Sequence, residues 1–180
     1  MTTTSSASSS ASQLDQLLTE RKNNPQEIVD VDEPVVKLVI FRLGEQYFAF
    51  LGSGIAEVIP GDTRVYFLPG MPASVEGVMN VRGDIESVIS LHELLHLNTL
   101  AAKPDLVTSS ILLGKGSSMH SGLRVDQLLD VVDFPESQLQ TPPSSLPEYL
   151  QPFVTNLLVF NGLPVTLLDI NAVFTSWLNS

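Results

Sequence analysis

The apolar residues of this chain gather in short runs, and each run is bounded by residues that favour turns. The runs at 37–43 and 46–51 are separated only by Gly44 and Glu45, which predicts a β-hairpin. The last two runs flank Asn161-Gly162, a dipeptide that favours a tight hairpin turn. In all, the pattern predicts strands over 37–43, 46–51, 55–59, 75–81, 84–91, 108–113, 119–125, 127–132, 156–160 and 163–168.

Helical signals are few. A short helix of about two turns at most is predicted over 92–97, and Asp169 is a suitable N-cap for a final helix over 170–178. Many closely spaced short strands with two short helices indicate a mainly β fold of small barrels. We therefore predict two small β-barrels that share a core, built from the strands at 36–91 and at 108–168.

The chain divides into a polar tail and a folded domain. Residues 1–34 begin with a Ser/Thr/Ala-rich stretch and continue as an acidic linker, so we predict a disordered tail there. The domain is expected over 35–178, with subdomains at about 36–97 and about 106–168 and the closing helix at 170–178. A proline-rich loop is expected over 134–152.

Charge and composition exclude several classes of function. Nine Lys and Arg residues against 20 Asp and Glu residues give a net charge of −11, which disfavours binding to nucleic acid. There is no cysteine, so no disulfide or thiol nucleophile is available and the cytoplasm is the expected compartment. No apolar run approaches the roughly 20 residues that span a bilayer. No nucleotide-binding motif is present, and we expect no cofactor.

One motif suggests catalysis. The residues 92–96, HELLH, match the HExxH pattern in which His92 and His96 would bind zinc on one face of a helix, with Glu93 as general base. A zinc-dependent hydrolase is therefore the alternative function. However, only a short helix fits here, and no convincing third ligand follows, because the remaining histidine is His120. We instead expect His92, Glu93 and His96 to face water while the leucines face the core, with no metal and no catalytic residue.

Five segments, taken in order, resemble the CheW family of bacterial chemotaxis coupling proteins. The most specific is 77–85, GVMNVRGDI, which continues to residue 91. The others are LVIFRLG with YFAF at 38–44 and 47–50, IAEVI at 55–59, LPGMP at 68–72 and LLDI at 167–170. The resemblance covers about 36–178. It departs from the family at Ser90, where members usually carry Asp, and in the longer tail and 134–152 loop.

The resemblance implies two SH3-like five-stranded barrels and an adaptor without activity of its own. Such adaptors bridge the cytoplasmic tip of a chemoreceptor, a methyl-accepting protein, and the regulatory domain of a CheA-type histidine kinase. A paralogue that serves another sensory array, such as one controlling type IV pilus motility, is equally open. A CheW-like scaffold of another two-component signalling system is a further alternative.

The same resemblance assigns candidate partner-binding residues, each with a structural alternative. Arg82 would face a partner, or it would be a solvated turn residue or pair with an internal carboxylate. Glu57 would contact a partner or simply point outward from its strand. Val58 and Val78 would line a receptor groove or belong to the core, and Gly83 would serve mainly backbone geometry.

Overall fold

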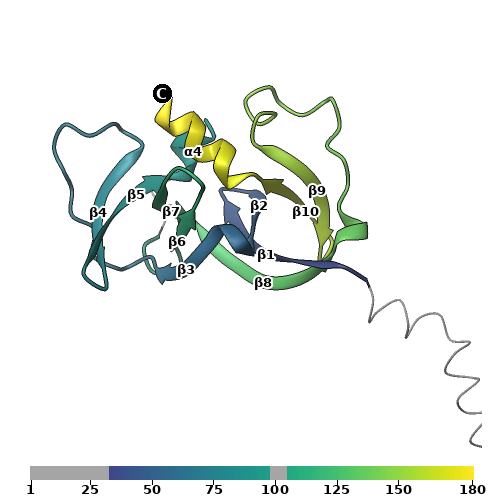
Figure 1. Ribbon diagram of the computed structural model, residues 1–180, viewed down its shortest axis with the longest axis horizontal. Coiled ribbons are helices and arrows are strands. Elements are labelled where there is room, and N and C mark those ends of the chain that lie inside the picture. Colours follow the sequence, from purple (N-terminus) through teal and green to yellow (C-terminus); the bar gives the residue numbers. More distant parts are fainter. Residues whose placement is uncertain (1–32, 98–104) are drawn as a thin grey trace, which may run out of the picture. The chain divides into compact units, whose positions relative to one another are not determined.

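Two antiparallel-rich sheets make up the folded domain in the computed structural model (Figure 1), which describes residues 33–97 and 105–180. The first sheet has five strands in the order β8-β1-β2-β10-β9, and the second has five in the order β3-β6-β7-β5-β4. The first sheet contains β1 (Val35–Leu43), β2 (Gln46–Leu51), β8 (Gln127–Pro135), β9 (Val154–Phe160) and β10 (Leu163–Leu168). The second sheet contains β3 (Ile55–Pro60), β4 (Val75–Val81), β5 (Asp84–Ser90), β6 (Ser110–Lys115) and β7 (His120–Val125). The short helices are η1 (Gly52–Gly54), α3 (Leu91–Leu94) and η2 (Glu136–Gln138), and α4 (Ile170–Leu178) closes the chain.

The predicted mainly β fold of two five-stranded units with a shared core is confirmed. Every predicted strand is present, and the tight turn at Asn161-Gly162 has the positive φ angles, 48° and 77°, that its sequence indicated. The Asp169 side chain caps α4 by accepting hydrogen bonds from the amides of Asn171 and Ala172. The predicted tail lies outside the described residues except for Glu33 and Pro34.

The division of the strands between the two sheets differs from the sequence expectation. The second sheet is one contiguous segment, β3 to β7, inserted between β2 and β8 of the first sheet. The expected sets at 36–91 and 108–168 are therefore wrong as structural units. The reason is long-range pairing: β2 joins β10 in parallel, with Tyr47 opposite Val165, and β1 joins β8 in antiparallel fashion.

The segment over 134–152 is more ordered than its prolines suggested. β8 runs on to Pro135, and the backbones of Gln140 and Leu157 exchange hydrogen bonds of 2.7 and 2.9 Å. Leu150 is buried, as is Phe153 just beyond the segment, and both pack into the shared core. The apolar side chains at the end of the segment hold it against the domain.

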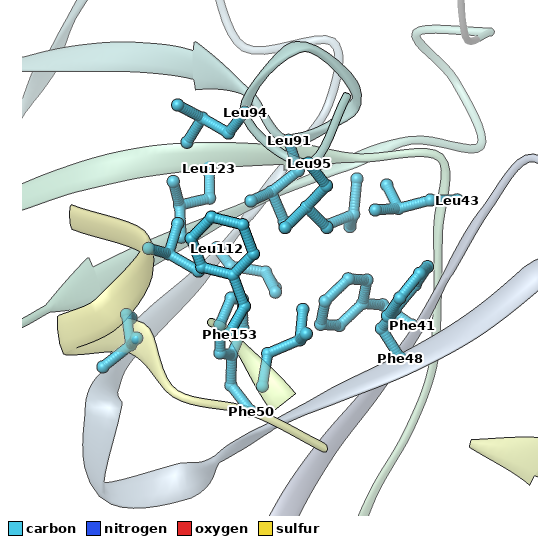
Figure 2. Packing of buried hydrophobic residues seen from close by; sticks show 14 of the residues in the cluster. Phe41, Leu43, Phe48, Phe50, Leu91, Leu94, Leu95, Leu112, Leu123 and Phe153 are labelled. Carbon is cyan, nitrogen blue, oxygen red and sulfur yellow. The ribbon is translucent and has the colours of Figure 1, made fainter. Parts of the chain in front are cut away.

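Strand β1 has two buried faces, which explains its unbroken apolar run. Leu38 and Ile40 point into the interior of the first sheet, whereas Val39, Phe41 and Leu43 point into a central core between the two sheets. Figure 2 shows this central core, in which residues of β1 and β2 meet residues of α3, β6 and β7. A third cluster fills the second sheet and contains Ile59, Met79, Val88 and Ile111.

Strands β1 and β2 of the first sheet contribute a group of aromatic rings to the central core. The rings of Phe41 and Phe50 stack with centroids 5.3 Å apart, and Phe41 and Phe48 stack at 6.2 Å. Helix α4 adds the buried Val173 and Phe174. The central core thus joins both sheets and the last helix.

We predict that Phe50→Ala lowers the free energy of unfolding by about 3–5 kcal/mol, because it opens a cavity in this fully buried core. Urea unfolding followed by circular dichroism measures the change. Val159→Ala is the control, since Val159 is 53% exposed on the first sheet and its truncation is expected to cost less than about 1 kcal/mol. Equal losses in the two variants would contradict the central role of Phe50.

Candidate functional site

An exposed ion pair connects the two edges of the second sheet. Glu57 lies on the edge strand β3, and Arg82 lies in the turn that follows the opposite edge strand, β4. Arg82 Nη2 donates to Glu57 Oε1 over 2.9 Å, with the Arg82 side chain 79% exposed and that of Glu57 31% exposed. Exposed pairs contribute only about 0–1 kcal/mol to stability. The pair fixes the position of an exposed guanidinium more than it stabilises the fold.

The backbone of the turn aims the guanidinium. Arg82 has φ of 52° and Gly83 has φ of 91°, so both central residues of the β4–β5 turn are left-handed. Gly83 donates its amide proton to Asn80 Oδ1 over 2.8 Å, which holds the turn. A residue with a Cβ loses about 1–2 kcal/mol in this conformation. Gly83 therefore serves backbone geometry, and Arg82 occupies a strained but fixed position.

The two predicted valines lie in different surroundings. Val58 is half-buried and packs against the central core, as expected if it belongs to the core rather than to a receptor groove. Val78 is half-buried on β4, and its backbone exchanges hydrogen bonds of 2.7 and 2.9 Å with Tyr66. Of the five predicted partner-binding residues, the structure thus brings Glu57, Arg82 and Gly83 together.

The pairing with Tyr66 places an apolar segment beside β4 that the sequence interpretation missed. Tyr66 is 50% exposed and Phe67 is 76% exposed. A Cβ on Gly77 would lie 2.2 Å from the Tyr66 carbonyl oxygen, so glycine permits this close approach. The family resemblance included the segment LPGMP at 68–72, but nothing in that segment indicated the bridge between Tyr66 and Val78.

A buried arginine anchors the start of this segment. Arg124 is 4% exposed, and its Nε donates to Glu76 Oε2 over 2.6 Å. Its Nη1 donates to the Gly61 carbonyl and to Ser109 Oγ, both over 3.0 Å. The guanidinium therefore ties the loop after β3 to the residue before β6. Removing one partner of a buried ion pair of this kind strongly destabilises a protein, because it leaves an uncompensated buried charge.

A pocket of about 300 Å³ opens where the two sheets meet α4. Leu51 and Thr155 line it from the first sheet, Lys115 lines it from the second, and Ile170 belongs to the helix. The lining mixes apolar side chains with polar ones, among them Ser53, Asp169 and Asn171.

The HELLH segment does not have the geometry that zinc binding needs. Helix α3 covers only Leu91–Leu94, and His96 lies beyond it with φ of 52°. The two imidazoles therefore do not stand one turn apart on a single helix. In the residues 33–97 and 105–180, no group of three or more His, Cys, Asp or Glu side chains is arranged to hold a metal ion. The zinc-hydrolase alternative loses its structural basis.

The expectation that His92 faces water is wrong. Its side chain is 14% exposed, and Nε2 lies 2.8 Å from Asp126 Oδ1. The leucine side of the prediction is confirmed, since Leu91, Leu94 and Leu95 are buried. A helix of one turn is too short for its periodicity to determine which side chains face solvent. The neighbouring strands determine which of them are buried.

Asp126 is held as a carboxylate. Burial raises the pKa of Asp126, but the hydrogen bonds from His92 and the Gly44 amide, with the charges of His92 and Arg42, outweigh burial and leave that pKa below its ordinary value. The Gly44 amide donates to Asp126 Oδ2 over 2.6 Å. Arg42 Nη1 donates to the Gly44 carbonyl over 2.7 Å and supports the same turn.

No helix among the described residues is long and apolar enough to cross a membrane.

Comparison with known proteins gives consistent similarities. A family model described as CheW-like domain matches residues 37–177. Chemotaxis protein CheW of Treponema pallidum is 27% identical over 81% of this chain and 86% of that protein. The Rhizobium meliloti protein of the same name is 29% identical over 78% and 88%. Protein PilI of Pseudomonas aeruginosa is 28% identical over 63% of this chain and 62% of that protein.

A solved structure shows the same fold. The crystal structure of the scaffolding protein TtCheW from Thermoanaerobacter tengcongensis matches with a TM-score of 0.68 and 23% identity. The match covers 78% of this chain and 93% of that chain.

We predict that Asp126 stabilises the domain above about pH 4 and loses this effect as pH falls through its lowered folded-state pKa. The free energy of unfolding of Asp126→Asn should therefore lie below that of the unaltered protein at pH 7, with a gap that narrows toward pH 3. Urea unfolding between pH 3 and pH 7 measures the gap. Asp130→Asn is the control, because Asp130 is exposed and accepts a hydrogen bond from the neighbouring Val131 amide. A gap for Asp126→Asn that is constant with pH would contradict the prediction.

Proposed function

The chain belongs to the CheW-like domain family, and on that premise we propose that it is a signalling adaptor with no catalytic activity of its own. Its two partners are the cytoplasmic tip of a chemoreceptor and the regulatory domain of a CheA-type histidine kinase, and it acts in the cytoplasm. Relatives named Chemotaxis protein CheW support the chemotaxis assignment.

The observation that carries the proposal is the fixed, exposed guanidinium of Arg82. In a chain with a net charge of −11, an arginine that projects into solvent is a distinctive contact for an acidic partner group. Glu57 pairs with it from the opposite edge strand of the second sheet, and this contact favours one orientation of the guanidinium. Charges of this kind set the register and association rate of an interface.

Apolar side chains would supply the buried part of the interface. Interfaces combine an apolar centre with a polar rim. Tyr66 and Phe67 offer exposed aromatic surface beside β4, and Leu51 offers an exposed apolar side chain at the pocket between the sheets. We place the partner contacts at these surfaces, with Glu57, Val78, Arg82 and Gly83 on the second sheet and Val58 acting through the core beneath it.

The same adaptor role in another two-component array is the second form of this proposal. The similarity to Protein PilI supports a role in pilus motility. The fold and the exposed pair serve either array equally, because neither feature depends on which receptor is bound.

We predict that Arg82→Ala weakens binding to the receptor tip or to the kinase regulatory domain by at least about fivefold, the effect of losing a contact worth about 1 kcal/mol. The free energy of unfolding should change by no more than about 1 kcal/mol, since the pair is exposed. Calorimetric titration of the full chain with each purified partner measures binding. Lys37→Ala is the control, because it removes one exposed positive charge from the first sheet.

A charge exchange separates the two roles of Arg82. If Arg82 only pairs with Glu57, the double variant Glu57→Arg/Arg82→Glu restores the pair and also restores binding. If Arg82 contacts a partner, the double variant binds as poorly as Arg82→Ala, which is the expected result. Unchanged binding of both partners by Arg82→Ala would refute the proposal for this surface.

A further inference from the structure

One carboxylate lies where the chain passes from the second sheet to the first. Asp126 follows the last residue of β7 and precedes the first residue of β8. Its Oδ1 lies 2.8 Å from His92 Nε2, and His92 belongs to α3, which follows β5 of the second sheet. Its Oδ2 accepts from the amide of Gly44 over 2.6 Å, and Gly44 lies in the β1–β2 turn of the first sheet. The two oxygens of Asp126 therefore hold elements of different sheets.

The ionised state of Asp126 fixes the direction of the hydrogen bond. A carboxylate accepts hydrogen bonds and cannot donate them, so His92 Nε2 carries the proton in this contact. The imidazole forms this bond either as a neutral group or as a cation. The Asp126 carboxylate makes this bond charge-assisted in either case, and a cationic imidazole adds Coulombic attraction between opposite charges. Histidine side chains ordinarily change charge between about pH 5 and 8.

Among the described residues, Arg42 and Glu93 are further charged groups near His92. Arg42 stays cationic, and it binds the Gly44 carbonyl and, over 3.3 Å, Gln127 Oε1. Glu93, the neighbour of His92 on α3, is exposed.

The elements that pack against α3 add few further charges. Helix α4 carries no charged side chain. On β7, Arg124 binds Glu76, and His120 binds Glu86 of β5, while Asp84 is exposed at the far end of β5.

We propose that His92, Asp126 and the Gly44 amide form a pH-dependent clasp between the two sheets, which is tighter when the imidazole is protonated. Protonation adds attraction between His92 and Asp126, and this attraction keeps the carboxylate in place for the Gly44 amide. The residues next to the clasp in the sequence, Leu43 and Leu91, are buried in the central core. The proposal concerns the fold alone and does not depend on which partner the adaptor binds.

The test follows the Gly44 amide in the full chain. Its exchange with solvent is measured by NMR at pH 5.5 and pH 8.0 and corrected for the intrinsic pH dependence of amide exchange. We expect about three- to tenfold greater protection at pH 5.5, because the cationic imidazole adds Coulombic attraction that holds the carboxylate in place for the Gly44 amide. His92→Ala should show low protection at both pH values. His92→Arg should show high protection at both, because a guanidinium remains charged.

His120→Ala is the matched control. His120 Nδ1 lies 2.9 Å from Glu86 Oε2, but both residues belong to the second sheet and His120 is 62% exposed. This variant should keep the pH dependence at Gly44. The proposal is overturned if the corrected protection of the unaltered protein is the same at both pH values, or if His92→Arg shows the same pH dependence as the unaltered protein. Should His92→Ala not fold, those two comparisons decide the outcome.

Discussion

The apolar layer between the two sheets is the interaction on which both sheets depend. Phe41, Phe48 and Phe50 reach it from the first sheet, and Leu112 and Leu123 reach it from the second. Each small sheet also has its own interior cluster, but these clusters are less extensive than the shared layer. Strands with two buried faces, such as β1, take part in both kinds of core. A change in the shared layer therefore affects both halves of the domain at once, while the exposed pair of Arg82 and Glu57 can vary without this cost.

The parallel pairing of β5 with β7 arranges three polar side-chain pairs in and beside the second sheet. Val88 lies opposite Gly122 in this pairing, an offset of 34 residues. The same offset separates Glu86 from His120, Ser87 from Ser121 and His92 from Asp126. A single register therefore sets three side-chain pairs, and the last of them lies where the chain leaves the second sheet.

Local features of the fold could be predicted from the sequence, and distant ones could not. The turn at Asn161-Gly162 and the cap at Asp169 depend on neighbouring residues, and both were predicted correctly. The fold of the second sheet brings Glu57 to Arg82, which are 25 residues apart in the sequence, and only the family resemblance had marked both. The environment of His92 was predicted wrongly for two reasons. A one-turn helix is too short for its period to decide which side chains face solvent. The contact with Asp126 depends on the pairing of distant strands, which no residues near His92 indicate.

The insertion of the second sheet within the first has a consequence for synthesis on the ribosome. All strands of the second sheet lie between residues 55 and 125, so their partners emerge in one continuous stretch. Strands β1 and β2 emerge earlier, but β1 lacks β8 until the chain has grown past residue 135, and β2 lacks β10 until it has grown past residue 168. During that interval β1 and β2 expose apolar faces and unpaired edges, the state in which nascent chains are most prone to aggregate. The arrangement that joins the two halves of the domain thus makes the burial of β1 and β2 depend on β8 and β10, which are synthesised later.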